Sequence, residues 1–129
     1  MVTTAKNAAM VLGLVFLIIG VLGFVPNPIV SPTGVFVVNR VHNCVHVGSG
    51  VLLLLGAYAS AGTFGPSLAL KLVGIVYAIL AVLGFITHDG MVFGVIAMNM
   101  ADNWLHLILA AVLLYAGFGL APQPGTAVA

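Results

Sequence analysis

Charged side chains are nearly absent from this sequence. Only 4% of its 129 residues are Asp, Glu, Lys or Arg, and the formal net charge is +1, whereas about a quarter of an ordinary soluble domain is charged. So few charges cannot cover a surface that faces water, and they form no basic stripe for a nucleic acid. The composition therefore excludes nucleic acid as a partner and indicates that a lipid bilayer surrounds the chain.

Cysteines and carboxylates are also scarce, which limits the chemistry. Cys44 is the only cysteine, so no disulfide forms within the chain, and we interpret it as a small residue near a helix start. Asp89 and Asp102 are the only carboxylates, and no carboxylate pair for acid–base catalysis is evident. Ser49 lies near His46 but has no orienting acid nearby. These shortages favour a non-enzymatic protein and make an enzyme the weaker hypothesis.

Long apolar runs fill most of the chain. They cover residues 8–25, 41–61, 68–86 and 104–120 and contain one charged residue, Lys71. Their lengths match the roughly 20 residues with which a helix crosses about 30 Å of hydrocarbon, and none alternates as a barrel strand does. We predict an all-α membrane protein of four transmembrane helices, a single domain over residues 1–129 with a tail at 121–129.

The two halves of the chain share a pattern. Polar residues recur at a constant spacing of 60 positions, as Asn39, Asn43 and His46 in the first half and as Asn99, Asn103 and His106 in the second. The first and third apolar runs align with a spacing of 61, which pairs Gly23 with Gly84. We predict two tandem two-helix repeats, at about residues 7–61 and 67–120, related by an axis along the membrane normal.

These stretches resemble a family of small bacterial four-helix membrane proteins, domain of unknown function 4383. The resemblance covers nearly the whole chain and rests on residues 21–25, 39–46 and 99–106. Its most specific part is the Asn-Trp-Leu-His stretch at 103–106. The resemblance implies the same four-helix membrane fold and implies no activity.

The few cations predict an orientation in the membrane. Lys6 and Lys71 lie on the side of the termini, and Arg40 lies on the side of the two longer connectors. Cations are enriched on the cytoplasmic side of membrane proteins. We therefore expect a multi-pass protein of the bacterial inner membrane with both termini in the cytoplasm.

The recurring polar residues stand at the starts of the second and fourth helices. Asn39 and Asn99 are predicted N-caps, and Asp102 is the predicted capping partner of Asn99. His46 and His106 follow seven residues after the caps, roughly 10 Å deeper at 1.5 Å per residue. They must face the bundle interior, because an unpaired polar group in lipid costs on the order of 2–7 kcal/mol.

A structural role is the first hypothesis for this polar cluster. Asn43 would bond His106 and Asn103 would bond His46, so that hydrogen bonds clasp the second and fourth helices. The protein would then carry no cofactor. It would act as a homo-oligomer or as an accessory subunit of a membrane complex.

A bound cofactor is the second hypothesis. His46 and His106 would hold a b-type haem or a transition metal between facing helices, with the asparagines orienting the imidazoles. A metal would recruit His42, one turn from His46, together with Asp102 or His88. A third hypothesis, a channel or transporter lined by histidines, requires an oligomer, because four helices leave little lumen.

Overall fold

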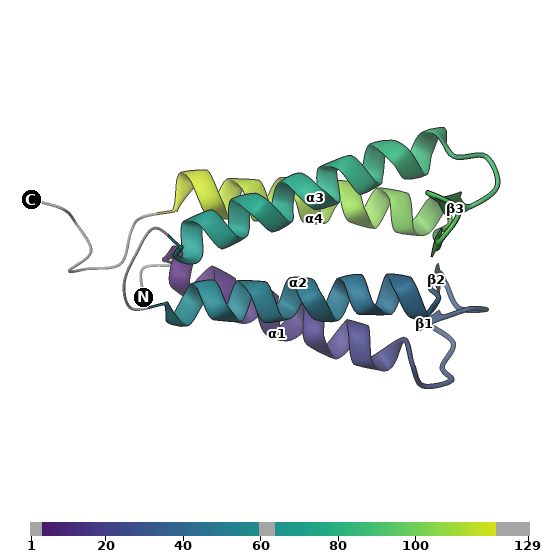
Figure 1. The fold of residues 1–129 in the computed structure, drawn as a ribbon, viewed down its shortest axis with the longest axis horizontal. Helices are drawn as coiled ribbons and strands as arrows, with labels where there is room; N and C mark the ends of the chain where they lie inside the picture. The colour runs from purple at the N-terminus through teal and green to yellow at the C-terminus, as the bar shows by residue number, and fades with distance from the viewer. Residues whose placement is uncertain (1–3, 60–63, 121–129) are drawn as a thin grey trace, which may run out of the picture.

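The computed structural model describes residues 4–59 and 64–120, which form four helices and four short strands (Figure 1). The helices are α1 (Ala5–Leu22), α2 (Arg40–Tyr58), α3 (Pro66–Ile86) and α4 (Met100–Gly119). The strands are β1 (Val30–Ser31), β2 (Phe36–Val37), β3 (Met91–Val92) and β4 (Ile96–Ala97). The predicted tail at 121–129 lies outside the described residues.

All four helices are long and apolar enough to cross a membrane, with 18 to 21 residues each. Their outward faces carry large apolar side chains, such as Ile18 at 66% exposed and Phe118 at 71% exposed. A soluble monomer rarely exposes apolar surface on this scale. The described part of the chain is therefore an all-α, multi-pass membrane protein, as predicted.

The helix ends differ from the ends of the apolar runs. α1 ends at Leu22, three residues before its apolar run ends, and the Asn27 amide donates to the Leu22 carbonyl at 3.0 Å. α2 begins at Arg40, directly after its capping asparagine, and ends at Tyr58 rather than at residue 61. Capping groups and turn residues, rather than hydropathy, set these boundaries.

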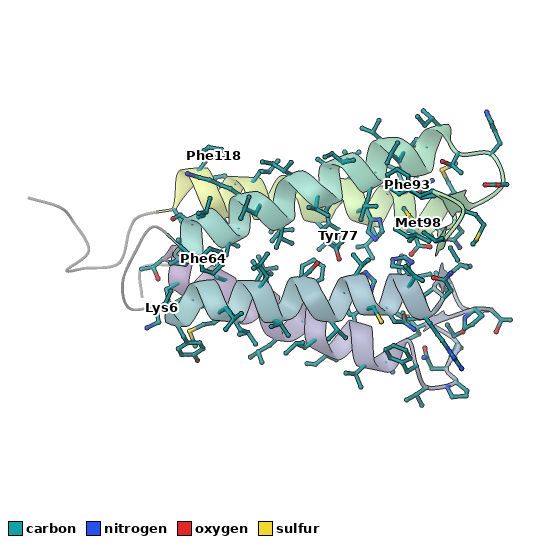
Figure 2. The ribbon with its side chains drawn as sticks, viewed as in Figure 1. Lys6, Phe64, Tyr77, Phe93, Met98 and Phe118 are labelled. Carbon is teal, nitrogen blue, oxygen red and sulfur yellow. The ribbon has the colours of Figure 1, made fainter. Side chains whose placement is uncertain are left out.

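The helices associate as two pairs, α1 with α2 and α3 with α4, and α2 and α3 form a smaller contact between the pairs (Figure 1). α1 begins and α4 ends at one end of the bundle, and the strands lie at the other end. The core between the pairs includes Phe16, Leu53, Leu70, Tyr77 and Leu113. Tyr77 lies between the two pairs in Figure 2, and its ring packs edge-on against Phe16 at 4.9 Å.

The two apolar connectors contain short strand pairs that the sequence analysis did not predict. β1 and β2 pair in parallel, and β3 and β4 form an antiparallel hairpin. Phe93 and Gly94 turn the hairpin with positive φ angles of 54° and 71°, the geometry of a type I′ turn. These folded connectors close one end of the bundle and supply backbone groups to the site below them.

Candidate functional site

The capping asparagines of α2 and α4 connect the two halves of the chain. Asn39 accepts from the His42 amide at 3.0 Å, and its own side-chain amide donates to the Val95 carbonyl at 2.8 Å. Asn99 caps α4 in the same way, and its side-chain amide donates to the Val35 carbonyl at 2.9 Å. Both predicted caps are confirmed. Each cap also binds the connector of the other half.

The residue three positions after each capping asparagine binds the opposite connector as well. His42 Nδ1 lies 2.7 Å from the Ala97 carbonyl. Since a carbonyl oxygen only accepts, Nδ1 donates and the Nε2 of the neutral ring keeps its lone pair. Asp102 Oδ2 accepts from the amides of Val37, at 3.0 Å, and Asn99, at 2.9 Å. The predicted capping role of Asp102 is confirmed, and the same carboxylate ties α4 to β2.

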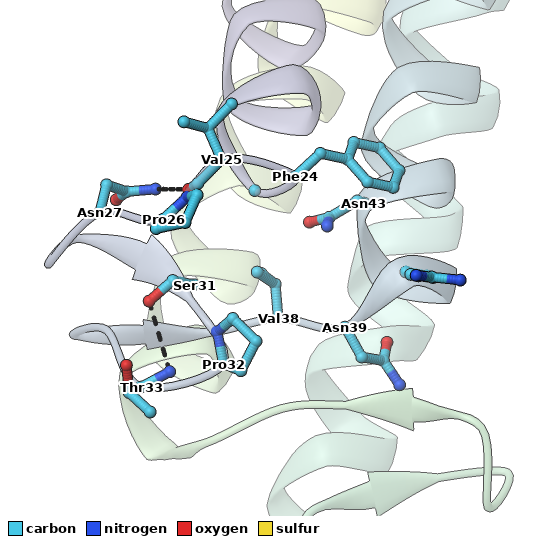
Figure 3. A pocket seen from close by; sticks show the side chains of 12 residues that line it. Phe24, Val25, Pro26, Asn27, Ser31, Pro32, Thr33, Val38, Asn39 and Asn43 are labelled. Atoms are coloured by element: carbon cyan, nitrogen blue, oxygen red, sulfur yellow. Dashed lines mark hydrogen bonds between the residues drawn. The ribbon is translucent and has the colours of Figure 1, made fainter.

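The predicted hydrogen bonds between asparagines and histidines are wrong. Oδ1 of Asn43, Oδ1 of Asn103 and both ring nitrogens of His106 have no hydrogen-bond partner among the described residues. The two amides instead pack against glycines of the neighbouring helices, Asn43 on Gly23 and Asn103 on Gly84. In Figure 3 the Asn43 side chain points from α2 toward the segment that follows α1.

The geometry of an α-helix explains why the predicted bonds between asparagines and histidines do not form. An asparagine and the histidine three residues later, as in Asn43 and His46, point roughly 60° apart at 3.6 residues per turn. The asparagine therefore faces the other helix of its own pair, and the histidine faces the centre of the bundle. Gly23 leaves the space that the Asn43 amide fills, since a Cβ at that position would overlap it.

Three histidines meet at the centre of the bundle. His42, His46 and His106 are all buried, and one ring nitrogen of each lies within 4.8 Å of the others. The ring centroids are 4.6 Å apart for His42 and His46, 5.3 Å for His42 and His106, and 6.1 Å for His46 and His106. The structure thus brings together the three histidines that the metal hypothesis named, and leaves its fourth candidate, Asp102, outside the group.

Most of the ring nitrogens in this cluster lack a hydrogen bond. Within the described residues, no partner reaches His42 Nε2, His46 Nδ1 or either nitrogen of His106. Burying a polar atom without a partner costs about 1–3 kcal/mol. These unpartnered nitrogens belong to the three rings that lie together, and a bound ion would give some of them a partner.

Aromatic side chains close the cluster on the side of the bundle core. The Tyr77 ring lies edge-on to His106 at 5.1 Å and stacks on His46 at 6.2 Å, and Phe16 lies 6.0 Å from His46. Neither aromatic residue was predicted from the sequence. They align with each other at the same spacing of 61 that pairs Gly23 with Gly84, and this signal could have identified them.

A cavity of about 200 Å³ adjoins the cluster on another side. Its polar lining consists of His46, Asp102 and His106. The remaining walls are apolar and come from α1, the first connector and α4, including Ile19, Val30, Phe36 and Leu105. The cavity therefore connects two of the three imidazoles with the Asp102 carboxylate.

Other candidates lie outside the group of three histidines. The group does not include the Asp102 carboxylate or His88. Asp89, beside His88, accepts from the Met91 amide at 3.0 Å and shapes the start of the second connector. Ser49 donates to the Val45 carbonyl at 2.8 Å within its own helix.

The sequence profile of one family, Domain of unknown function (DUF4383), matches residues 6–119. The matched range contains all three clustered histidines and both capping asparagines. No curated protein and no solved structure matches the chain.

Proposed function

The chain belongs to the family Domain of unknown function (DUF4383), and we propose that it is an integral membrane protein that binds a transition-metal ion at His42, His46 and His106. The observation that carries this proposal is a buried group of three imidazoles, each with one ring nitrogen within 4.8 Å of the others, in which four ring nitrogens have no hydrogen-bond partner among the described residues. Coordination would give these nitrogens the partners that the protein itself does not provide.

The hydrogen bond of His42 supports the same proposal. Metal-binding histidines commonly donate their other ring N–H to a backbone carbonyl or carboxylate, which orients the ring and fixes the tautomer. His42 donates from Nδ1 to Ala97, and its Nε2 is buried without a partner among the described residues. Metal–nitrogen bonds of about 2.0–2.1 Å require nitrogens about 3.4 Å apart, so the three ligand atoms, which lie within 4.8 Å of one another, would approach by up to about 1.4 Å on binding an ion.

The chemistry of the ligands narrows the choice of ion. Imidazole suits Zn²⁺, copper, nickel and iron, whereas Ca²⁺ and Mg²⁺ prefer oxygen. The group holds three imidazoles and no carboxylate. A first-row transition metal, with Zn²⁺ as the first choice to test, fits this set.

Haem is the weaker alternative. A bis-histidine haem needs a porphyrin between His46 and His106, but the His42 ring lies 4.6 Å and 5.3 Å from these two rings. The adjoining cavity of about 200 Å³ is smaller than the roughly 300–1,000 Å³ of pockets for larger organic ligands. A single ion needs no such space.

The two-repeat organisation remains part of the proposal. The exchange of hydrogen bonds from Asn39 to Val95 and from Asn99 to Val35 supports tandem repeats related by an axis along the membrane normal. The positions of Lys6 and Lys71 support cytoplasmic termini in a bacterial inner membrane. Exposed apolar helix faces support association with a second copy or with another membrane protein.

Metal analysis of the purified protein tests the proposal. The full chain would be purified in mild detergent, stripped with a chelator and titrated with Zn²⁺. We expect about one ion per chain in the wild type and its loss in His42→Ala, His46→Ala and His106→Ala. His88→Ala is the matched control and should retain the ion. A folded wild type that takes up no stoichiometric metal would contradict the proposal, and a Soret band that shifts on reduction would favour haem.

A further inference from the structure

Three histidines supply one ligand fewer than the four that Zn²⁺ usually binds. The cavity beside them is where a fourth ligand would lie. This step rests on the proposed function. We infer that the ion keeps a fourth coordination position facing the cavity, that water or a small monoanion occupies this position, and that Asp102 accepts a hydrogen bond from the bound water.

The number of ligands supports an open position. Structural zinc sites are closed by four protein ligands, whereas sites with three protein ligands keep a water or substrate in the fourth position. Among the described residues, the ligand group contains His42, His46 and His106 and no fourth member. Tyr77 and Phe16 cover the core side of the cluster, so the cavity side is where the extra ligand fits.

The size and lining of the cavity restrict that ligand. One water occupies about 30 Å³ in the liquid, so a cavity of about 200 Å³ accommodates a few small molecules. Its walls are apolar except for His46, Asp102 and His106. A ligand of a few atoms fits, and a larger organic substrate does not.

Asp102 is positioned to interact with a bound water. Its Oδ2 is held by two backbone amides, those of Val37 and Asn99. Its Oδ1 makes no hydrogen bond to another described residue. Asp102 precedes His106 by one helical turn, so both side chains share one face of α4. Asp102 lines the cavity together with His46 and His106, so we assign its second oxygen as the acceptor for a water on the ion.

Charge favours a monoanion as the exchangeable ligand. The three neutral imidazoles add no charge to a divalent ion, and the Asp102 carboxylate contributes one negative charge. One positive charge remains, and an uncompensated buried charge is costly. A single monoanion neutralises the site, whereas a dianion would reverse its charge.

Azide binding to the Co²⁺-loaded full chain in detergent tests this inference. Co²⁺ replaces Zn²⁺ as a coloured probe, and we expect azide to shift its visible bands and to saturate at one azide per ion. Leu105→Trp, which fills the cavity, should still bind Co²⁺ but should weaken azide binding by about tenfold or more. Val30→Phe blocks the cavity from the opposite wall and should act in the same way.

Two further variants separate the effect of filling the cavity from the effects of adding a bulky side chain to α4 and of changing the charge near the site. Leu107→Trp lies on the same helix but is exposed, and it should bind azide as the wild type does. Asp102→Asn removes the negative charge beside the ion and should tighten azide binding by about tenfold or more.

The outcomes distinguish this inference from the proposed function. Bound Co²⁺ whose spectrum ignores azide would overturn the open position and leave the metal site standing. An unchanged azide response in Leu105→Trp and Val30→Phe would overturn the role of the cavity. Failure of the wild type to bind Co²⁺ at all would overturn the proposed function, and this inference with it.

Discussion

Asn39 and Asn99 each cap one helix and donate to the connector of the other half, Asn39 to Val95 at 2.8 Å and Asn99 to Val35 at 2.9 Å. Each of these side chains therefore caps a helix and also forms a contact between segments more than 50 residues apart. The two hydrogen bonds are reciprocal, because a side chain of each half of the chain binds the connector of the other half.

The first prediction concerns these caps. Asn39→Ala removes a cap, worth about 1 kcal/mol, and a hydrogen bond, worth about 0.5–1.5 kcal/mol, so we expect a loss of about 1.5–2.5 kcal/mol of unfolding free energy. Asn39→Asp keeps the cap acceptor and loses the amide donor, so its loss should be smaller. Helical circular dichroism during thermal unfolding in detergent measures both, with the exposed Thr33→Ala as control. Equal losses for Asp and Ala would contradict the assignment of the amide.

The second prediction concerns the glycines beside the buried asparagines. A Cβ at Gly23 would overlap the Asn43 amide, and a Cβ at Gly84 would overlap that of Asn103. Gly23→Ala and Gly84→Ala should each lower stability by about 1–3 kcal/mol through overpacking. Gly48 is the matched control, because nothing lies within 4 Å of a Cβ there.

The control should change stability in the opposite direction. Gly48→Ala is expected to stabilise α2 by about 0.5–1 kcal/mol, since alanine loses less backbone entropy than glycine in a helix. The same thermal unfolding measurement applies. If Gly23→Ala were as stable as Gly48→Ala, the close approach of α1 and α2 at Asn43 would be incorrect.

The third prediction concerns Tyr77, which packs on the histidines from α3. Tyr77→Phe keeps its ring contacts and loses only the hydroxyl contact with Ser49 at 3.4 Å, so stability should fall by no more than about 1 kcal/mol. Tyr77→Ala removes the ring and should cost about 3–5 kcal/mol. Tyr115→Ala is the control, because Tyr115 is 69% exposed. A large loss in Tyr77→Phe would show that the hydroxyl matters more than the ring.

The fourth prediction concerns metal and stability together. An ion that binds only the folded chain raises its unfolding free energy, by about 2.7 kcal/mol when free ion is 100 times the Kd. Zn²⁺ should therefore raise the thermal midpoint of the wild type, and a chelator should reverse the effect. His106→Ala should not respond to Zn²⁺, whereas His88→Ala should respond fully. A Zn²⁺ response that persists in His106→Ala would place the ion elsewhere.

The sequence predicts the helices and their caps because both signals are local. Long apolar runs mark the spans, and Asn39 and Asn99 mark where two helices begin. The Asn43–His106 bond was predicted wrongly, because spacing along a helix gives only an approximate direction for a side chain. Gly23 carried the missing information, since only a glycine leaves room for the amide of Asn43.

The rest of the site depends on contacts between distant segments. His42 becomes a member of the cluster with a defined tautomer because β4 presents the Ala97 carbonyl to it. The two-residue strands of the connectors are too short to show an alternating pattern, so β4 could not be placed from the sequence. In the sequence Tyr77 is one of many apolar residues of α3. Only the packing of the helices brings it against His46 and His106.

The hydrogen bond from His42 to Ala97 joins two segments that are synthesised at different times, because 55 positions separate them. His42 and His46 leave the ribosome long before Ala97 and His106 exist, so the first two helices enter the membrane with an incomplete cluster. The cluster is assembled only when the second connector has folded over α2 and the last helix has been inserted. The proposed ion would therefore be captured late in biogenesis, because its three ligands are complete only after the last helix is inserted.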